Sequence, residues 1–217
     1  MRAMETLPSE PNLFPRYSHA ERLTHWAVAV CYVALFLSGL AMFHPYFYWL
    51  SALFGGGPFL RILHPFLGVT LAVLFAAYAV RLVPDNRFTA SDRRWLGKMF
   101  DYMNKLGEEE PVEGKYNAGQ KLMYWSMVGV IAVLVVTGVL MWRPYFAPHV
   151  AVPLRRVAGV LHAIAAFVMF VGIGVHVYAA YWTKGSMRAM TRGTVTRAWA
   201  KFHHPGWYAK VAGKDAP

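Results

Sequence analysis

Four long apolar segments alternate with polar segments along the chain. They run from about residue 23 to 43, 61 to 83, 122 to 142 and 157 to 182, and each holds at most two charged residues. About 20 apolar residues are needed to cross the hydrocarbon core of a bilayer as a helix. The pattern therefore predicts an all-α integral membrane protein, a bundle of four transmembrane helices.

The polar segments predict loops and a tail. Pro45 and the stretch Gly55-Gly56-Gly57-Pro58 mark a loop after the first helix. Residues 84–121 hold too many charges to cross the membrane, so we expect a loop with one short surface helix at about 92–106. The basic and aromatic tail, residues 183–217, suits the membrane surface or a partner protein. We expect one membrane domain over residues 1–217 and no second domain.

Composition narrows the class and the chemistry. The chain is 57% hydrophobic and only 15% charged, as in polytopic membrane proteins. Its single cysteine, Cys31, excludes disulfides, cysteine-ligated iron–sulfur clusters and c-type haem attachment within this chain. The N-terminal residues 1–24 lack the apolar core of a signal peptide, so we expect the first helix to direct insertion.

The basic residues predict the orientation. Of the 22 Lys and Arg residues, 18 lie before the first span, in or at the edges of the middle loop, or in the tail. By the positive-inside rule, we expect both termini and the middle loop to be cytoplasmic. The net charge is +11, and the basic residues flank the spans instead of forming a basic face on a globular domain. This distribution favours anionic lipid and partner subunits over nucleic acid as binding partners.

Histidines within the spans suggest a cofactor. His162 and His176 are 14 positions apart in the last span, which puts them within about 40° of one helix face and about 21 Å apart along the axis. With the predicted orientation, His25 lies at the cytoplasmic depth of His176. His64, placed near its helix start by Pro65, lies at the outer depth of His162. Each same-depth pair could supply both axial ligands of one b-type haem.

A simpler interpretation is that each of these histidines hydrogen-bonds a neighbouring helix. His44 rivals His64 for the outer site, but it lies about 100° around its helix from His25, so we expect an interfacial role. Solvated or hydrogen-bonded roles are expected for His19, His149, His203 and His204.

Several glycines fall inside the spans and would let helices or a flat macrocycle approach closely. Packing roles are expected for Met169, Phe170 and Trp125. The glycines are Gly39, Gly68, Gly129, Gly138, Gly159, Gly172 and Gly174.

Motifs in order along the chain carry a resemblance to a known family. They are RLTHWAV, RILHPFLG, GKYNAGQK, TGVLMWRPYFA, GVLHAIA, GVHVYAAYW, KGSMRAM, RAWAKFHHPGWY. From about Arg16 to Tyr208 the chain closely resembles the cytochrome b (gamma) subunit of membrane-bound respiratory formate dehydrogenase. That subunit is an electron-transfer component of an enzyme complex; formate is oxidised on another subunit.

The resemblance implies four helices that hold two haem b groups, with iron ligands at His64 and His162 (outer haem) and at His25 and His176 (inner haem). It also implies two partner subunits, an iron–sulfur (beta) subunit and a molybdenum or tungsten catalytic (alpha) subunit, which form a heterotrimer with this chain. Whether heterotrimers assemble into a higher oligomer stays open. Electrons would pass to a quinone, menaquinone or ubiquinone, near the cytoplasmic side. The quinone contacts fall on Asn117 and Gly119, with Gln120 added for its proximity. Without the resemblance, Asn117 would be interpreted as a helix N-cap.

Two other hypotheses stay open at this point. A cytochrome b subunit of a nickel–iron hydrogenase, or of a related quinone-linked reductase, would share the haem design but have a different partner. A membrane anchor or transporter without haem would use the same histidines for packing or metal binding, and it would leave their matched depths to chance.

Overall fold

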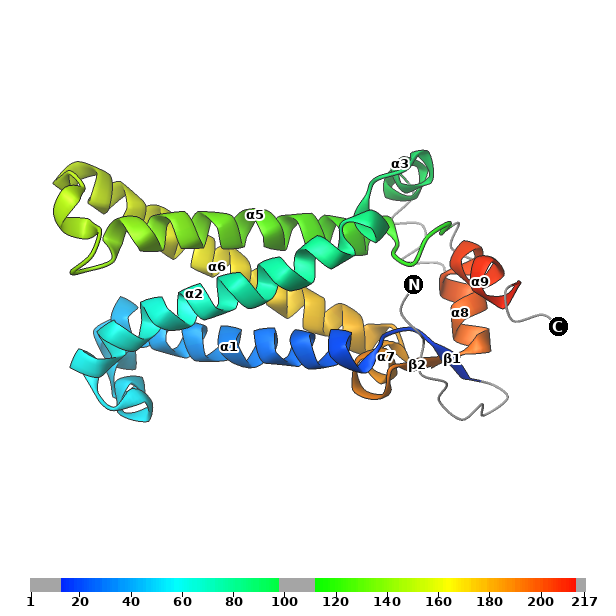
Figure 1. Ribbon diagram of the computed structural model, residues 1–217, viewed down its shortest axis with the longest axis horizontal. Helices are drawn as coiled ribbons and strands as arrows, with labels where there is room; N and C mark the ends of the chain where they lie inside the picture. Colours follow the sequence, from blue (N-terminus) through cyan, green and yellow to red (C-terminus); the bar gives the residue numbers. More distant parts are fainter. Residues whose placement is uncertain (1–12, 98–111, 214–217) are drawn as a thin grey trace. The chain divides into compact units, whose positions relative to one another are not determined.

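The computed structural model describes residues 13–97 and 112–213. Within them, four helices are long and apolar enough to cross a membrane: α1 (His19–Phe43), α2 (Gly57–Leu82), α5 (Ala118–Met141) and α6 (Val152–Trp182) (Figure 1). The predicted set of four membrane-spanning helices is therefore confirmed. Part of the short surface helix predicted at 92–106 lies outside the described residues.

Each of the four helices begins four or five residues before the predicted apolar segment. Hydropathy marks where charge ends, but a helix begins where its first backbone N–H groups find acceptors. At α1 the Glu21 backbone N–H donates to the Ser18 hydroxyl, and the Ser18 N–H donates to the Glu21 carboxylate. The same reciprocal cap joins Asn117 and Gln120 before α5. Both are capping boxes, with partners three residues apart.

The other two long helices begin at a proline. Pro58 follows Gly57 at the start of α2, and Pro153 follows Val152 at the start of α6. Proline suits the first helical turn because its missing N–H would have no helical partner there. The prediction that His64 and Pro65 lie at a helix start was wrong: α2 begins at Gly57, and Pro65 is inside the helix.

Shorter elements connect and flank the long helices. The loop after α1 is a 3-10 helix, η1 (Pro45–Phe54), closed by Gly55 and Gly56 with positive φ. The other helices of the described residues are η2 (Pro84–Asn86), α3 (Ala90–Gly97), η3 (Ala147–His149), α7 (Ser186–Arg192), α8 (Arg197–His203) and α9 (Pro205–Ala212). Two three-residue strands, β1 (Leu13–Pro15) and β2 (Thr194–Thr196), depart from the predicted all-helical chain.

The chain divides into two compact units. The membrane unit consists of Leu23–Val80 and Ser126–Val175, and the polar unit consists of Met1–Arg22, Arg81–Trp125 and His176–Pro217. The core of the membrane unit is built from Cys31, Leu71, Ile131 and Met169, one from each long helix. Met169 therefore has the packing role expected for it. The prediction of one domain stays a prediction.

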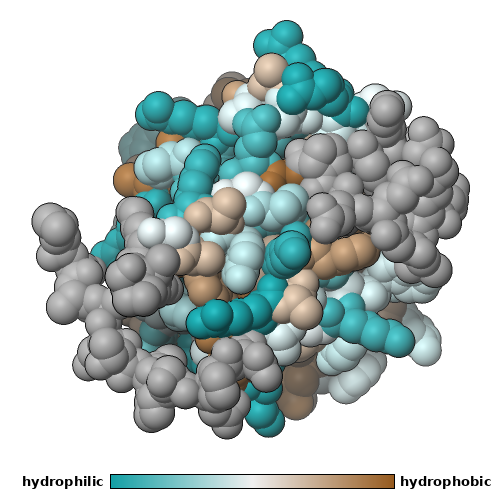
Figure 2. Space-filling view, turned by 90° about the vertical axis from the view of Figure 1, so that its right-hand side faces the viewer, coloured by the Kyte–Doolittle hydropathy of each residue, from teal (hydrophilic) through white to brown (hydrophobic). Residues whose placement is uncertain are grey.

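The polar unit joins the N-terminal segment to the tail. β1 pairs with β2 in an antiparallel arrangement with Phe14 opposite Val195, and both side chains are buried in a small core. Figure 2 shows hydrophilic residues over much of the face that this unit presents, with smaller apolar patches between them. The tail predicted to be a surface segment thus forms part of a folded unit.

Arg16 links three parts of the polar unit. Its guanidinium carbon lies 4.9 Å from the ring centres of both Trp199 and Trp207, in cation–π distance. Its Nη2 donates to the Lys115 carbonyl at 2.7 Å and to the Nε2 of His204 at 3.1 Å. Because Nε2 accepts this bond, the His204 imidazole is neutral.

The buried environment of His204 agrees with a neutral ring. Its burial, the charge of Arg16 and the neighbouring His203 lower the pKa of His204 to about 2. The sequence analysis expected a solvated or hydrogen-bonded role for this histidine, and the structure gives it the second.

A glycine at the end of α7 allows the close approach of β1. Gly193 has φ of 80°, and its carbonyl accepts from the backbone N–H groups of Arg16 and Tyr17. A Cβ there would lie 2.7 Å from the Tyr17 carbonyl oxygen. Both features exclude a side chain at this position without a shift of the backbone.

Gly193→Ala should therefore destabilise the protein by about 1–3 kcal/mol, through the strained φ and the backbone clash. The measurement is the thermal unfolding midpoint of the protein purified in detergent. Gly114→Ala is the matched control, because a Cβ there makes only ordinary contact, 3.8 Å from the Tyr116 oxygen. Equal midpoints for the two variants would contradict this assignment.

Candidate functional site

The membrane unit brings two of the predicted histidines together. His64 of α2 and His162 of α6 have ring centres 6.4 Å apart, with an angle of 66° between the ring planes. The two residues are 98 positions apart in the sequence, and the structure places them at one level of the unit, as the depth argument predicted.

Each imidazole is held at its Nδ1 atom by a hydroxyl group from another helix. His64 Nδ1 lies 2.8 Å from the Ser38 hydroxyl of α1, and His162 Nδ1 lies 2.9 Å from the Thr137 hydroxyl of α5. All four long helices therefore contribute to this site: two carry the imidazoles and two carry the hydroxyl groups that hold them.

The spacing of the two rings fits opposite ligands of one metal ion. An imidazole nitrogen lies about 2 Å from the metal it binds and its ring centre about 1 Å further, so two opposed imidazoles have centres roughly 6 Å apart. The observed 6.4 Å agrees with this value. Two axial nitrogens are what a b-type haem takes from a protein with bis-histidine ligation, since the porphyrin supplies the other four.

Glycines beside the hydroxyl residues leave room for the rings. A Cβ on Gly39 would lie 3.4 Å from His64 Cε1, and a Cβ on Gly138 would lie 3.4 Å from His162 Cε1. These two glycines thus have the close-approach role expected of them. By contrast, a Cβ on Gly68, Gly129, Gly172 or Gly174 would meet no described atom within 4 Å.

The second predicted pair lies on α1 and α6. His25 belongs to the membrane unit and His176 to the polar unit. Their pairing as ligands of a second haem stays a prediction. His44, the rival for the outer site, is the N-cap of η1 and accepts from the backbone N–H of Tyr46.

The predicted quinone contacts lie at the start of α5, in the polar unit. The Asn117 side-chain oxygen accepts from the Gln120 N–H at 2.9 Å, and the Gln120 side-chain oxygen accepts from the Asn117 N–H at 3.0 Å. Both residues therefore have the helix-capping role that was the simpler interpretation of Asn117. A Cβ on Gly119 would lie 3.3 Å from the Trp95 ring, so a glycine suits this tight place.

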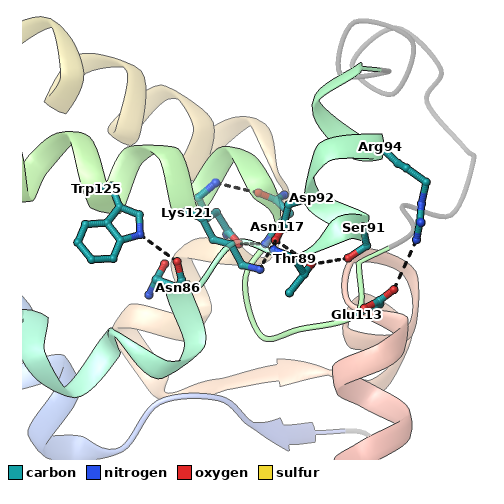
Figure 3. Close-up of polar contacts among 10 residues, drawn as sticks. Asn86, Thr89, Ser91, Asp92, Arg94, Glu113, Asn117, Lys121 and Trp125 are labelled. Carbon is teal, nitrogen blue, oxygen red and sulfur yellow. Dashed lines mark hydrogen bonds and ion pairs between the residues drawn. The ribbon is translucent and has the colours of Figure 1, made fainter.

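A buried ion pair supports this part of the polar unit (Figure 3). Lys121 of α5 donates to the Asp92 carboxylate of α3 at 2.7 Å, and both side chains are buried. Thr89 donates to the same carboxylate oxygen through its N–H and its hydroxyl. Burial alone would raise the pKa of Asp92, but the hydrogen bonds from Lys121 and Thr89, with the Lys121 charge, lower it below 3.8.

Comparison with known proteins decides the family. The model of prokaryotic cytochrome b561 matches residues 16–193. The chain belongs to the prokaryotic cytochrome b561 family. Membership implies that an integral membrane protein of this kind carries haem b, and the His64–His162 pair is a suitable place for its iron.

Comparison with individual proteins gives a closer similarity. The chain is 40% identical to the cytochrome b556(Fdn) subunit of the nitrate-inducible formate dehydrogenase of Escherichia coli K12, over 96% of both chains. It is 41% identical to the cytochrome b556(fdo) subunit of formate dehydrogenase from the same organism, over 90% of this chain and 92% of that one. For the formate dehydrogenase cytochrome b556 subunit of Haemophilus influenzae the identity is 38%, over 89% and 81%. The resemblance predicted from the motifs is confirmed.

Sequence reasoning missed the two hydroxyl residues and the ion pair. Ser38 and Thr137 were visible as polar residues before a glycine, in LSGL and VTGV, within otherwise apolar spans. A Ser or Thr followed by Gly inside an apolar span is thus a pattern that could have pointed to a hydrogen-bond partner for a histidine on a neighbouring helix. The Asp92–Lys121 pair left no such signal, because the two residues are 29 positions apart among many other charges.

Proposed function

We propose that this chain is the dihaem cytochrome b subunit of a respiratory formate dehydrogenase in the bacterial inner membrane. The observation that carries the proposal is the His64–His162 pair, with ring centres 6.4 Å apart and both Nδ1 atoms held by hydroxyl groups. The identity of about 40% to formate dehydrogenase cytochrome b556 subunits over nearly the whole chain supports the partner assignment.

His64 and His162 would hold the outer haem through their Nε2 atoms. A haem bound there supplies one-electron transfer. The protein's part would be to hold both imidazole rings in a fixed orientation, through the hydroxyl groups at their Nδ1 atoms, among apolar residues. The same unit contains the buried apolar core of Cys31, Leu71, Ile131 and Met169. Apolar surroundings of this kind suit a buried haem. His25 and His176 would hold the inner haem.

The charge distribution supports the proposed orientation, and the similarity to formate dehydrogenase subunits supports the proposed direction of electron flow. With the termini and middle loop in the cytoplasm, the His64–His162 pair lies toward the outer side. Electrons from formate would arrive there through an iron–sulfur subunit, itself joined to a molybdenum or tungsten subunit. Two electrons would pass to a quinone at the cytoplasmic side, and the two protons needed to form the quinol would be taken up from the cytoplasm. Electrons arriving from outside and protons taken from inside would store charge across the membrane.

The start of α5 is the proposed quinone contact. The Asn117 oxygen accepts a hydrogen bond in the helix cap, so a hydrogen bond to a quinone oxygen would have to come from the side-chain NH2 group, which has two hydrogens to donate. The Gly119 backbone N–H lies in the first helical turn, where the helix itself supplies no acceptor. Gln120 would act through its cap with Asn117, by holding the loop in place.

The test is reduction by substrate. Formate added to the purified complex should reduce the b-type absorption bands within the turnover time, and metal analysis should find molybdenum or tungsten. Reduction by hydrogen with nickel in the complex would assign the chain to a hydrogenase instead. A colourless protein would return the histidines to packing or non-haem metal binding.

The capping role of Asn117 can be separated from a quinone contact. Asn117→Ser keeps an oxygen that caps α5 but removes the amide N–H, whereas Asn117→Ala removes both. We expect the serine variant to keep the wild-type unfolding midpoint and to raise the KM for quinone several-fold, up to about tenfold for one lost hydrogen bond. The alanine variant should lose about 1 kcal/mol of stability in addition. A wild-type KM in the serine variant would refute the contact.

A further inference from the structure

The membrane unit contains the same local arrangement twice. On α1, Ser38 precedes Gly39; the Ser38 hydroxyl bonds to His64 of α2, and a Cβ on Gly39 would lie 3.4 Å from the same ring. On α5, Thr137 precedes Gly138; the Thr137 hydroxyl bonds to His162 of α6, and a Cβ on Gly138 would lie 3.4 Å from the same ring. In each case a hydroxyl group meets the imidazole Nδ1 while the glycine leaves room beside Cε1. The two halves of the site are therefore built alike from unrelated stretches of sequence.

The hydrogen bonds of the hydroxyl groups fix their direction. Ser38 donates its only hydrogen to the Leu35 carbonyl at 3.0 Å. Thr137 donates to the Val133 carbonyl at 2.6 Å, with the Leu134 carbonyl at 3.2 Å. Such bonds to the preceding helical turn are the usual arrangement for Ser and Thr in apolar helices. Each hydroxyl can then only accept from the histidine.

The tautomer of each histidine follows. A ring whose Nδ1 faces an acceptor carries its proton on Nδ1, and its Nε2 has a lone pair to offer to a metal. Both hydroxyl residues are buried, with Ser38 at 0% and Thr137 at 5% exposure, so water does not compete for these bonds. An outer partner of this kind fixes the orientation of a ligating imidazole and makes it a stronger donor to the metal.

We propose that Ser38 and Thr137 are positioning residues that hold His64 and His162 in the metal-binding tautomer and lower the reduction potential of the haem between them. The inference rests on the proposed haem ligation. A stronger imidazole donor stabilises ferric iron over ferrous iron, so loss of either hydroxyl raises the potential of this haem. The other haem keeps its potential, because neither hydroxyl contacts His25 or His176 among the interactions that the structure gives them.

The test uses the purified complex with Ser38→Ala and Thr137→Val, which remove the hydroxyl and change the volume little. Ser38→Thr and Thr137→Ser keep it. Thr70→Val is the control: Thr70 lies on α2 with the same bond to the preceding turn, to the Phe66 carbonyl, but is exposed. Haem content, a redox titration of both haems and the low-temperature electron paramagnetic resonance spectrum are measured for each.

Both hydroxyl-removing variants should raise the potential of the same haem and shift its low-spin ferric signal. The expected size is a several-fold to tenfold change in its reduced-to-oxidised ratio at fixed potential, at most ~59 mV for one electron. In the hydroxyl-keeping exchanges and in Thr70→Val, the reduced-to-oxidised ratio of each haem at fixed potential should stay within about twofold of the wild-type ratio. Where a hydroxyl-removing variant loses the haem, loss of that haem alone, with retention in the hydroxyl-keeping exchange, supports the proposal.

Unchanged potentials and signals in Ser38→Ala and Thr137→Val, with both haems present, would overturn the inference and leave the proposed function intact. Equal shifts of both haems, or shifts in Thr70→Val as large as in Thr137→Val, would overturn it as well. Absence of haem from the wild-type complex is a separate result, because it would refute the proposed ligation itself.

Discussion

Replacing either His64 or His162 with alanine should remove the same haem and lower the haem content from two per chain to one. The reason is geometric: the two rings face one site with centres 6.4 Å apart, so each variant deprives one iron of an axial ligand. The measurement is a pyridine haemochrome count on the purified complex, with a reduced-minus-oxidised spectrum to identify the haem that is lost.

If His64 and His162 bind the same iron, the double variant gives a further test beyond the haem count of each single variant. The double variant His64→Ala/His162→Ala should retain one haem, like each single variant, because both ligands serve the same iron. His25→Ala and His176→Ala should remove the other haem and leave the first. Thr70→Val, an exposed position on α2, should retain both. Loss of different haems in His64→Ala and His162→Ala would show that the two histidines do not share a site.

Breaking the buried ion pair of the polar unit should have the largest effect on stability. Lys121→Met leaves the Asp92 carboxylate buried without its cation, and removing one partner of a buried pair costs about 3–5 kcal/mol. Removing both charges, in Asp92→Asn/Lys121→Met, should cost clearly less, since no charge is left buried alone. The measurement is the thermal unfolding midpoint of the purified complex.

An exposed ion pair in the same unit provides the control. Arg94 and Glu113 lie 3.7 Å apart with side chains 69% and 62% exposed, so Arg94→Gln should cost less than about 1 kcal/mol. A loss in Lys121→Met no larger than that in Arg94→Gln would contradict the assigned role.

The ion pair also predicts a pH dependence. Because the folded pKa of Asp92 is lowered below 3.8, the carboxylate stabilises the fold above that pH. This contribution is lost as the pH falls from about 4 through the lowered value. Asp92→Asn should remove this component of acid destabilisation, whereas Arg94→Gln should keep it.

Much of the fold follows from hydropathy because the membrane imposes a simple rule. Apolar segments long enough to cross the membrane are expected to be helices, and the four such segments correspond to the four long helices. The helix starts were predicted too late because they depend on caps such as Ser18 with Glu21, and on Pro58 and Pro153, which lie among polar residues. Pro65 was misplaced for the same reason.

The site was predictable in part. Same-depth histidines identify the His64–His162 pair because a helix converts sequence spacing into depth and direction. The hydroxyl partners depend on how α1 packs on α2 and α5 on α6, which spacing within one helix cannot give. The antiparallel β1–β2 pair and the contact of Arg16 with His204 join residues more than 170 positions apart, so no local pattern indicates them.

The most direct measurement for the proposed function is the haem content of the wild-type complex purified from membranes. The proposal predicts two b-type haems per chain, both reduced by formate, with bis-histidine low-spin spectra. One haem would limit the proposal to the His64–His162 site, and a complex without haem would contradict it.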